Sequence, residues 1–334
     1  MLVQSYSQLP DRCWTYDQAL AVIAFVAAGE HHSARNILST LEHLQNEDGS
    51  FYFSYLISTL SPPAGGERVY SGTVAWVAMA VNFYRGLTSD NRFFPLLHKT
   101  LCWLEKQQEL ERGSPAFGGI TFGMRRDILS TEHNLDCYSA FRHAGAGRCQ
   151  DRAQWIKKFI LRQLFRPRPA PHFITGYNDD SLYLDCQSWA FLALGRKYRT
   201  VLKFALDRFQ VNDGRLDEKR GIQGFFERAA AGAPVWSEGS LGMALALYLN
   251  GEKEKGDFYF KQIQEMVTPE GGVRYATRND LDFSTSPSVA GTAWSIFYEM
   301  KINPFEHGRR ARKAAKRLAT GRRQAAKASL VRSR

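Results

Sequence analysis

Cysteine is scarce in this chain of 334 residues and follows no recognisable pattern. The five cysteines are odd in number and widely spaced, without a Cys-x-x-Cys pair: Cys13, Cys102, Cys137, Cys149 and Cys186. Disulfide frameworks and zinc ribbons need paired or regularly spaced cysteines. The pattern therefore indicates neither, and we expect reduced thiols.

Long apolar runs are also missing. No run approaches the roughly 20 residues that a membrane-spanning helix needs. The start of the chain lacks the basic stretch, apolar middle and small-residue cleavage site of a secretion signal. These absences predict a cytoplasmic protein without a transmembrane segment.

Several motifs that carry chemistry are absent as well. The chain holds no Gly-x-Gly-x-x-Gly, no phosphate-binding loop, no His-Glu-x-x-His and no Gly-x-Ser-x-Gly. Nucleotide-binding enzymes, zinc proteases and serine hydrolases need these motifs to hold a phosphate, a metal ion or a nucleophile. Those classes therefore have no support, and we expect neither a cofactor nor a metal ion.

Negative charge is missing from the C-terminal stretch. The net charge is +11, and residues 308–334 contain eleven Lys or Arg but no Asp or Glu. The 33 basic residues before this stretch balance the 33 acidic residues of the chain. A block of one sign is typical of a solvated, disordered extension, with contact to nucleic acid or an anionic surface as the alternative. We therefore predict one domain over residues 1–307 and a basic tail over 308–334.

What the chain does contain is an internal repeat. Its hydrophobic content of 44% is ample for a packed core. Six times, about every 50 to 60 residues, a polar or aromatic cluster leads into an apolar stretch rich in small residues. The clusters begin at Trp14, Tyr70, Thr131, Tyr183, Trp236 and Ser286. Because the stretches that follow are apolar nearly all round, we expect helices of an inner layer.

Amphipathic segments alternate with these stretches. Apolar residues three and four apart mark segments 33–45, 93–110, 151–165, 198–210 and 257–266 as outer helices. Six inner and about six outer helices that alternate along a chain close most simply into a toroid. We predict an all-α fold, an (α/α)6 toroid of six helical hairpins with short extended segments in the connecting loops. Thr15 with Gln18, and Ser286 with Pro287, have the spacing of helix caps.

The sequence resembles the six-hairpin glycosidase-like superfamily of (α/α)6 toroids. The resemblance covers roughly residues 14–305 and rests on TYDQALAVIAF, LQNEDGSFY, STEHNLDCY and SPSVAGTAW with the later Asn303-Pro304-Phe305. It implies a substrate groove at one rim of the barrel. It also implies that carboxylates from the inner helices and their preceding loops act as acid and base.

A second resemblance is to terpenoid cyclases and prenyltransferase subunits, which also form toroids of alternating helices. The stretches LQNEDGSFY and EGGVRY look similar to their turns that contain Gln and Gly. The acid clusters expected there are missing, and Asn178-Asp179-Asp180 is a weak echo of them. Terpenoid chemistry is kept as an alternative.

Carboxylates gather where the inner helices begin. Glu132 and Asp136 are four residues apart, so both lie on one face of a helix. Two acids there repel each other and are costly to desolvate, which indicates a functional reason for them. Since the inner helices begin at one rim, we expect five catalytic candidates to converge: Asp17, Glu132, Asp136, Asp185 and Glu238. Stabilisation of the helix dipole is the simpler explanation for the acids in a first turn.

Aromatic and polar side chains near the same helix ends suit a sugar. Sugar rings bind through flat apolar faces and through polar groups that meet their hydroxyls. The candidates for substrate binding are His133, Asn134, Tyr16, Trp76, Gln187, Trp189 and Trp236. The tryptophans are explained equally well as core residues. His133 fits a partner of a neighbouring acid better than a metal ligand.

The leading hypothesis is a glycoside hydrolase that acts on an oligosaccharide or polysaccharide. Glycosidic cleavage needs one protonated and one ionised carboxyl group. We assign Glu132 as general acid, with Asp136 tuning its pKa, and Asp185, Glu238 or Asp17 as the base. One alternative is a lyase or epimerase, in which His133 or a tyrosine removes a proton. Another is a non-catalytic toroid that binds glycans or serves as a scaffold.

Overall fold

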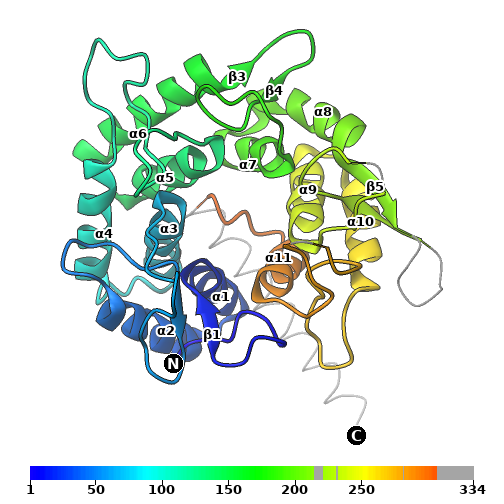
Figure 1. Cartoon of the computed structure of the whole chain (residues 1–334), viewed down its shortest axis with the longest axis horizontal. Coiled ribbons are helices and arrows are strands. Elements are labelled where there is room, and N and C mark those ends of the chain that lie inside the picture. The colour runs from blue at the N-terminus through cyan, green and yellow to red at the C-terminus, as the bar shows by residue number, and fades with distance from the viewer. Residues whose placement is uncertain (214–220, 231, 281, 307–334) are drawn as a thin grey trace, which may run out of the picture.

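Six inner helices form a ring around a common axis. The computed structural model describes residues 1–213, 221–230, 232–280 and 282–306, and Figure 1 looks down the axis of the ring. The inner helices are α1 (Thr15–Ala28), α3 (Ser71–Thr88), α5 (Thr131–Ala144), α7 (Leu184–Leu194), α9 (Ser237–Asn250) and α11 (Val289–Met300). Each predicted apolar stretch forms one of them, so the predicted repeat is confirmed.

Outer helices cover most of the ring. They are α2 (His31–Leu44), α4 (Phe94–Lys106), α6 (Arg148–Phe159), α8 (Thr200–Phe209) and α10 (Lys253–Gln264). Each buries one stripe, as α2 does with Ile37, Leu38 and Leu41. A Cβ on Gly256 of α10 would lie 2.8 Å from the carbonyl oxygen of Ala244, so glycine permits the close contact with α9. The described residues contain five outer helices and none after α11, so the predicted sixth lies outside the described residues.

Short antiparallel strands lie in the connecting loops, as predicted. β1 (Arg12–Trp14) pairs with β2 (Ser54–Leu56), β3 (Phe165–Arg166) with β4 (His172–Phe173), and β5 (Gln210–Asp213) with β6 (Ile222–Phe225). Two short helical segments, η1 (Ile160–Leu164) and η2 (Arg196–Tyr198), adjoin α6 and α8. β2 to β6 and η1 lie where the chain returns from an outer helix to the next inner helix, whereas β1 precedes α1 and η2 leads from α7 to α8.

A closed ring of hydrogen bonds joins the loops at the N-terminal ends of the inner helices. The first residue of each inner helix donates its backbone N–H to a carbonyl of the loop that precedes the next inner helix. The pairs are Thr15 to Phe53, Ser71 to Phe122, Thr131 to Thr175, Leu184 to Glu227, Ser237 to Tyr275 and Val289 to Ser5, at 2.7–3.1 Å. Hydroxyls of the four Ser and Thr among these donors add a second bond to the same loop. The bond to Ser5 returns to the N-terminal segment and closes the rim.

A second set of contacts, which we call the clamps, fixes each loop to its own helix. The fourth residue of five inner helices has a polar side chain that bonds to the backbone of one loop residue. The pairs are Gln18 with Val3, Asn134 with Ile120, Gln187 with Phe173, Ser240 with Phe225 and Thr292 with Val273. Buried backbone groups must be paired, and the clamps satisfy those that no strand satisfies.

The two predicted helix caps are wrong for a related reason. The N-cap of α1 is Trp14, which makes no side-chain cap bond, and Gln18 is used in a clamp. α11 begins at Val289, and its cap is Ser288, whose Oγ accepts a hydrogen bond from the backbone N–H of Gly291 at 3.0 Å. Polar side chains at these helix starts bond mostly to the loops beside them.

The opposite end of the barrel is closed by the chain that follows α11. Phe305 is fully buried, and its ring centroid lies 5.4 Å from those of Trp76 and Trp189. The Phe305 carbonyl accepts hydrogen bonds from Ser139 Oγ at 2.8 Å and His143 Nε2 at 3.1 Å. Aromatic packing therefore fills this end, and polar groups gather at the other.

Three further predictions concern the whole chain. No helix among the described residues combines the length and apolar character needed to cross a bilayer. All five cysteines lie in the described ranges as free thiols. The predicted basic tail over residues 308–334 lies outside the described residues.

The clamps predict a stability effect at Gln187. Replacing this fully buried side chain with leucine leaves the N–H and C=O of Phe173 without their partner. Since each unpaired buried group costs about 1–3 kcal/mol, we expect Gln187→Leu to lower the free energy of unfolding by about 3 kcal/mol in urea titrations. Gln154→Leu on the exposed face of α6 is the matched control. Equal effects of the two substitutions would refute the role of the clamp.

Candidate active site

The predicted carboxylates lie in the first turns of four inner helices, α1, α5, α7 and α9, and one turn deeper in α5. Asp17 is the third residue of α1, Glu132 and Asp136 are the second and sixth of α5, and Asp185 and Glu238 are the second residues of α7 and α9. The hydrogen-bond ring holds these helix starts side by side. Burial raises the pKa of Glu132 well above its usual range, and the charges of Asp185, Glu238 and Glu227 raise it further. Acids that are about a hundred residues apart in sequence thus act on one another in one site.

The five acids differ in access to solvent. Asp17, Asp136 and Glu238 are 4%, 1% and 5% exposed. Glu132 and Asp185 are partly exposed. Glu132 and Asp185 are therefore the most accessible of the five acids.

Asp185 has the smallest rise in pKa of the five. Its Oδ1 accepts a hydrogen bond from the backbone N–H of Cys186 at 2.7 Å, at the helix end where the dipole favours negative charge. Burial raises the pKa of Asp185, the bond from Cys186 lowers it, and the resulting value is about 6. The Asp185 carboxylate is therefore mostly ionised at neutral pH.

Glu238 lies under a cluster of tyrosines. The Tyr16 hydroxyl donates a hydrogen bond to Glu238 Oε1 at 2.5 Å. Burial raises the pKa of Glu238 to about 8, although the bond from Tyr16 lowers it. The rings of Tyr6 and Tyr275 lie 5.4 Å apart beside this pair, and burial raises the pKa of both hydroxyls. Glu238 is therefore mostly protonated at neutral pH.

Asp136 and His133 pack against the start of α3. Burial, followed by the charges of Glu132 and Asp185, raises the pKa of Asp136 well above its usual range, although the neighbouring Trp76 side chain lowers it. His133 stacks on Phe122 with ring centroids 4.1 Å apart, and burial lowers its pKa to about 3. A Cβ on Gly72 would lie 2.4 Å from the His133 ring and 3.0 Å from Asp136 Oδ2. Glycine at this point of α3 makes room for a protonated carboxyl and a neutral imidazole.

The residues predicted to bind substrate divide into two groups. Tyr16 and His133 lie among the acids. Asn134 and Gln187 are fully buried, and their amides form clamps to the loop backbone. The rings of Trp76, Trp189 and Trp236 are also buried; the first two fill the barrel axis, and the third packs on Phe283.

The structure adds one acid that sequence reasoning missed. Glu227 follows β6, is partly exposed, and its backbone carbonyl is the ring partner of Leu184. Its side chain forms an ion pair with Arg228 at 2.9 Å, and burial raises its pKa. Loop lengths differ between repeats, so comparing the repeats at their helix starts gave no signal for this position. Glu227 is identified because its backbone carbonyl belongs to the hydrogen-bond ring at the rim.

The rim thus holds protonated acids beside an ionised one. Glu132 can donate a proton, and Asp185 can accept one or act as a nucleophile. No group of three or more His, Cys, Asp or Glu side chains among the residues that the structure describes is placed to hold a metal ion.

Comparisons with known proteins identify the fold. No protein-family model and no curated protein sequence matches the chain. A solved glycosidase structure is similar over 90% of each chain, with a TM-score of 0.66 and 9% identity. A D-mannose isomerase is similar over 87% of each chain, with a TM-score of 0.63 and 13% identity. A sugar epimerase from a ruminal bacterium is similar over 89% of this chain and 91% of its own, with a TM-score of 0.63 and 12% identity.

At these identities the likeness shows the fold alone. The neighbours are helical toroids, and the chain has the six-hairpin glycosidase-like fold that the resemblance implied. The predicted fold is therefore confirmed. What the site does must be argued from its own residues.

The buried acids predict an inverse dependence of stability on pH. Asp17, Asp185 and Glu238 have pKa values of about 7, 6 and 8 in the folded chain, above their ordinary 3.8, 3.8 and 4.5. The folded state holds these protons more tightly, so their stabilising contribution is full at low pH and is lost as pH rises to about 8. Glutamine at position 238 cannot ionise. As the pH rises from about 5 to about 8.5, we therefore expect the free energy of unfolding of Glu238→Gln to increase by roughly 3 kcal/mol relative to that of the unmodified chain.

Urea unfolding at the two pH values measures this gain. Glu254→Gln on the exposed face of α10 serves as the control and should show no gain. If Glu238→Gln changes stability equally at both pH values, Glu238 is not protonated in the folded chain.

Proposed function

We propose that the chain is a glycoside hydrolase of an oligosaccharide or polysaccharide, with Glu132 as general acid and Asp185 as base or nucleophile. One feature carries the proposal: the surroundings of the two partly exposed carboxyl groups among the predicted five raise their pKa values to different degrees. Burial and three neighbouring acids raise the pKa of Glu132, whereas a backbone hydrogen bond holds that of Asp185 to about 6. Glycosidic cleavage needs this combination of a protonated and an ionised carboxyl group.

The proposed reaction moves one proton and breaks one bond. The protonated Glu132 donates its proton to the glycosidic oxygen as the bond from that oxygen to the anomeric carbon breaks. Asp185 either removes a proton from the water that attacks this carbon, or attacks the carbon itself and is later released by water. In the second case Glu132, now ionised, takes the proton from that water.

The neighbouring acids would keep Glu132 protonated while Asp185 is ionised. Negative charge on a neighbour disfavours ionisation of Glu132, as two carboxyl groups close together cannot both ionise easily. Asp136 and Glu238 have raised pKa values of their own, which favours their protonated forms. Glu227 is paired with Arg228 and supplies negative charge near Glu132 and Asp185.

Proton abstraction next to a carbonyl by His133 or a tyrosine, as in the predicted lyase or epimerase, has weaker support. It needs a base whose pKa lies near the working pH. His133, with a pKa of about 3, is a poor base at neutral pH, and the raised pKa values of the rim tyrosines keep their hydroxyls protonated. The fold neighbours include both sugar hydrolases and enzymes that isomerise sugars, which supports a sugar substrate for this chain.

Activity on glycans tests the proposal. The purified chain should release reducing ends from one or more members of a panel of neutral, amino and acidic oligosaccharides and polysaccharides. Removing the general acid should lower kcat by about 100-fold to 10,000-fold, so Glu132→Gln should lose turnover while still binding the glycan. Glu270→Gln, on an exposed loop, is the matched control. New ultraviolet-absorbing double bonds would identify a lyase, and glycan binding without any product would identify a binding module.

The dependence of activity on pH should show the titration of the same two groups, Asp185 and Glu132. Activity should rise as Asp185 ionises near pH 6 and fall at higher pH as Glu132 loses its proton, because kcat/KM follows the groups of the free enzyme. The charge of Glu227 raises both pKa values, so Glu227→Gln should move both limbs to lower pH. If neither limb of the pH profile moves, the charge of Glu227 does not act on Asp185 or Glu132.

A further inference from the structure

Six aromatic side chains form an arc along the N-terminal rim, and we call this set the aromatic arc. Each ring contacts the next edge to face, with centroids 5.2–6.4 Å apart and interplanar angles of 69–89°. In order along the rim they are Tyr275, Tyr6, Trp14, Phe53, Tyr70 and Phe122. All six are partly exposed, whereas the tryptophans predicted from the sequence to bind sugar are buried.

The hydrogen-bond ring at the rim sets the position of the arc. Trp14 and Tyr70 are the N-cap residues of α1 and α3. The backbone carbonyls of Phe53, Phe122 and Tyr275 accept three of the bonds in that ring. Helix starts and loop backbone therefore hold five of the six aromatic residues in place.

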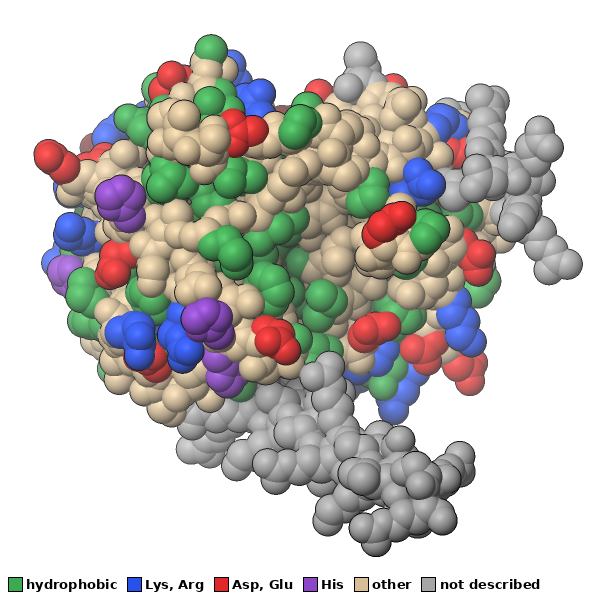
Figure 2. Space-filling model, turned by 90° about the horizontal axis from the view of Figure 1, so that it is seen from below, with side chains coloured by type: hydrophobic (Ala, Val, Ile, Leu, Met, Phe, Trp, Pro, Cys, Tyr) green, Lys and Arg blue, Asp and Glu red, His purple; other side chains and the backbone are tan. Residues whose placement is uncertain are grey.

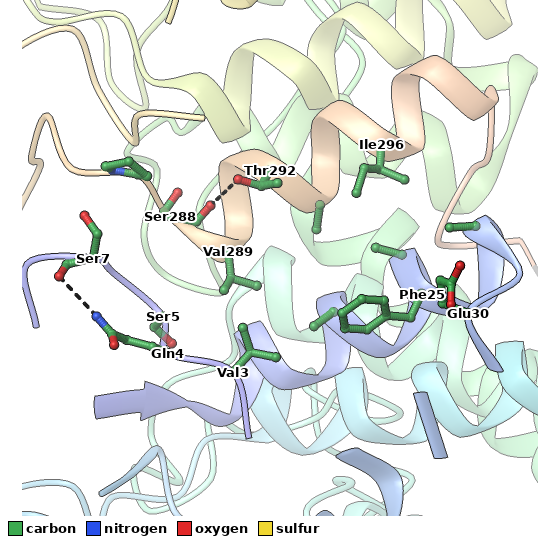
Figure 3. Close-up of a pocket in the computed structure, with 15 residues that line it drawn as sticks. Val3, Gln4, Ser5, Ser7, Phe25, Glu30, Ser288, Val289, Thr292 and Ile296 are labelled. Carbon is green, nitrogen blue, oxygen red and sulfur yellow. Dashed lines mark hydrogen bonds between the residues drawn. The ribbon is translucent and has the colours of Figure 1, made fainter. Parts of the chain in front are cut away.

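The N-terminal segment places the sixth member, Tyr6, beside the start of α11. Tyr6 forms a β-bridge with Ser288, and the backbone N–H of Ser7 donates to the carbonyl of Pro287 at 3.2 Å. Figure 3 shows Ser5 and Ser7 of this segment near Ser288. Because the backbone on both sides of the arc is fixed, its rings are positioned before a ligand binds, which lowers the entropic cost of binding.

Both ends of the arc reach the acids of the site. At one end Phe122 stacks on His133, whose neighbour in the chain is Glu132. At the other end burial raises the pKa of the Tyr275 hydroxyl, and the nearby charge of Glu238 raises it further. The arc leaves open the part of the rim between α5 and α9, where α7 begins (Figure 1). A sugar residue that rests on either end of the arc therefore has acids beside it.

A second apolar surface lies between α1 and α11. It is a groove of about 550 Å³, and Phe25, Val289 and Ile296 are among its lining residues (Figure 3). Figure 2 views the molecule from this side and shows apolar side chains around a hollow. Among the residues that the structure describes, none of the acids at the rim lines this groove. The aromatic arc, by contrast, adjoins those acids.

We propose that the aromatic arc binds the sugar residues next to the glycosidic bond that is cleaved. This inference rests on the proposed function and names the surface that would hold the rest of the substrate. Pyranose rings have apolar C–H faces that pack on aromatic rings, while their hydroxyls point outward to water or polar groups. Six aromatic rings in a continuous row give room for several sugar residues. The substrate is therefore a chain of sugars that lies along the rim.

Tryptophan fluorescence tests contact with the arc. The full chain carrying Glu132→Gln, which leaves the probes intact, is titrated with cellohexaose, mannohexaose, chitohexaose and maltohexaose. At least one of these should change the emission, and Trp14→Phe should abolish most of that change. Trp155→Phe is the matched control, because Trp155 is also partly exposed beside an arginine but lies on α6. An undiminished change in Trp14→Phe, or no response to any hexasaccharide, would overturn the proposal.

The dependence of affinity on sugar-chain length tests the extent of the arc. In calorimetric titrations, Phe53→Ala in the middle of the arc should weaken binding of the hexasaccharide by about tenfold. It should affect the corresponding disaccharide much less, because a disaccharide occupies only the end of the arc beside the acids. Phe258→Ala, which removes an exposed ring on α10, should change neither affinity. Equal losses for both lengths, or no loss for either, would contradict the proposal.

Release of reducing ends, measured on the unmodified chain, separates this inference from the proposed hydrolase function. If the hexasaccharide binds through the arc but no glycan is cleaved, the role of the arc stands and the hydrolase assignment fails. If glycans are cleaved, and Trp14→Phe and Phe53→Ala bind the hexasaccharide as tightly as the unmodified chain, the hydrolase assignment stands and the role of the arc fails.

Discussion

The hydrogen-bond ring at the N-terminal rim is the constraint on which the rest of the structure depends. Six inner helices that are apolar nearly all round could slide along one another, because apolar packing has no direction. The bonds from each first residue to the next loop fix the height of every helix start. The bond from Val289 to Ser5 joins α11 to the N-terminal segment before α1, so the hydrogen bonds continue around the whole rim. The clamps then tie five of the loops to their own helices at the fourth residue.

Fixing the helix starts has an electrostatic consequence. Acids in the first turns of α5, α7 and α9 are brought into one small, poorly hydrated space, where ionisation of each disfavours ionisation of the next. The helix ends and the backbone bond to Asp185 act in the opposite direction at one position. The site therefore separates its acids into protonated and ionised groups through burial, neighbouring negative charge and one backbone hydrogen bond. That separation is the physical basis of the proposed acid and base roles.

Much of this was predictable from the sequence, for identifiable reasons. The inner helices could be found because stretches such as the one after Thr131 lack a polar face, and Glu132 and Asp136 were noticeable because acids there need an explanation. Glu227 could not be found, since its role depends on a loop whose length differs from those of the other repeats. Asn134 and Gln187 have polar side chains near the site, and the sequence alone does not show that backbone groups of Ile120 and Phe173 use their amides. The sixth outer helix was expected from the symmetry of the repeat, and none of the described residues forms it.

Infrared difference spectroscopy of the carboxyl groups tests the central claim most directly, because it reports protonation without requiring a known substrate. Spectra of the unmodified chain at neutral pH would be compared with those of Glu132→Gln and Asp185→Asn. The account predicts that Glu132→Gln removes a band of a protonated carboxyl group and that Asp185→Asn removes a band of an ionised one. Loss of ionised bands in both variants would contradict it, since the rim would then hold no proton donor at Glu132.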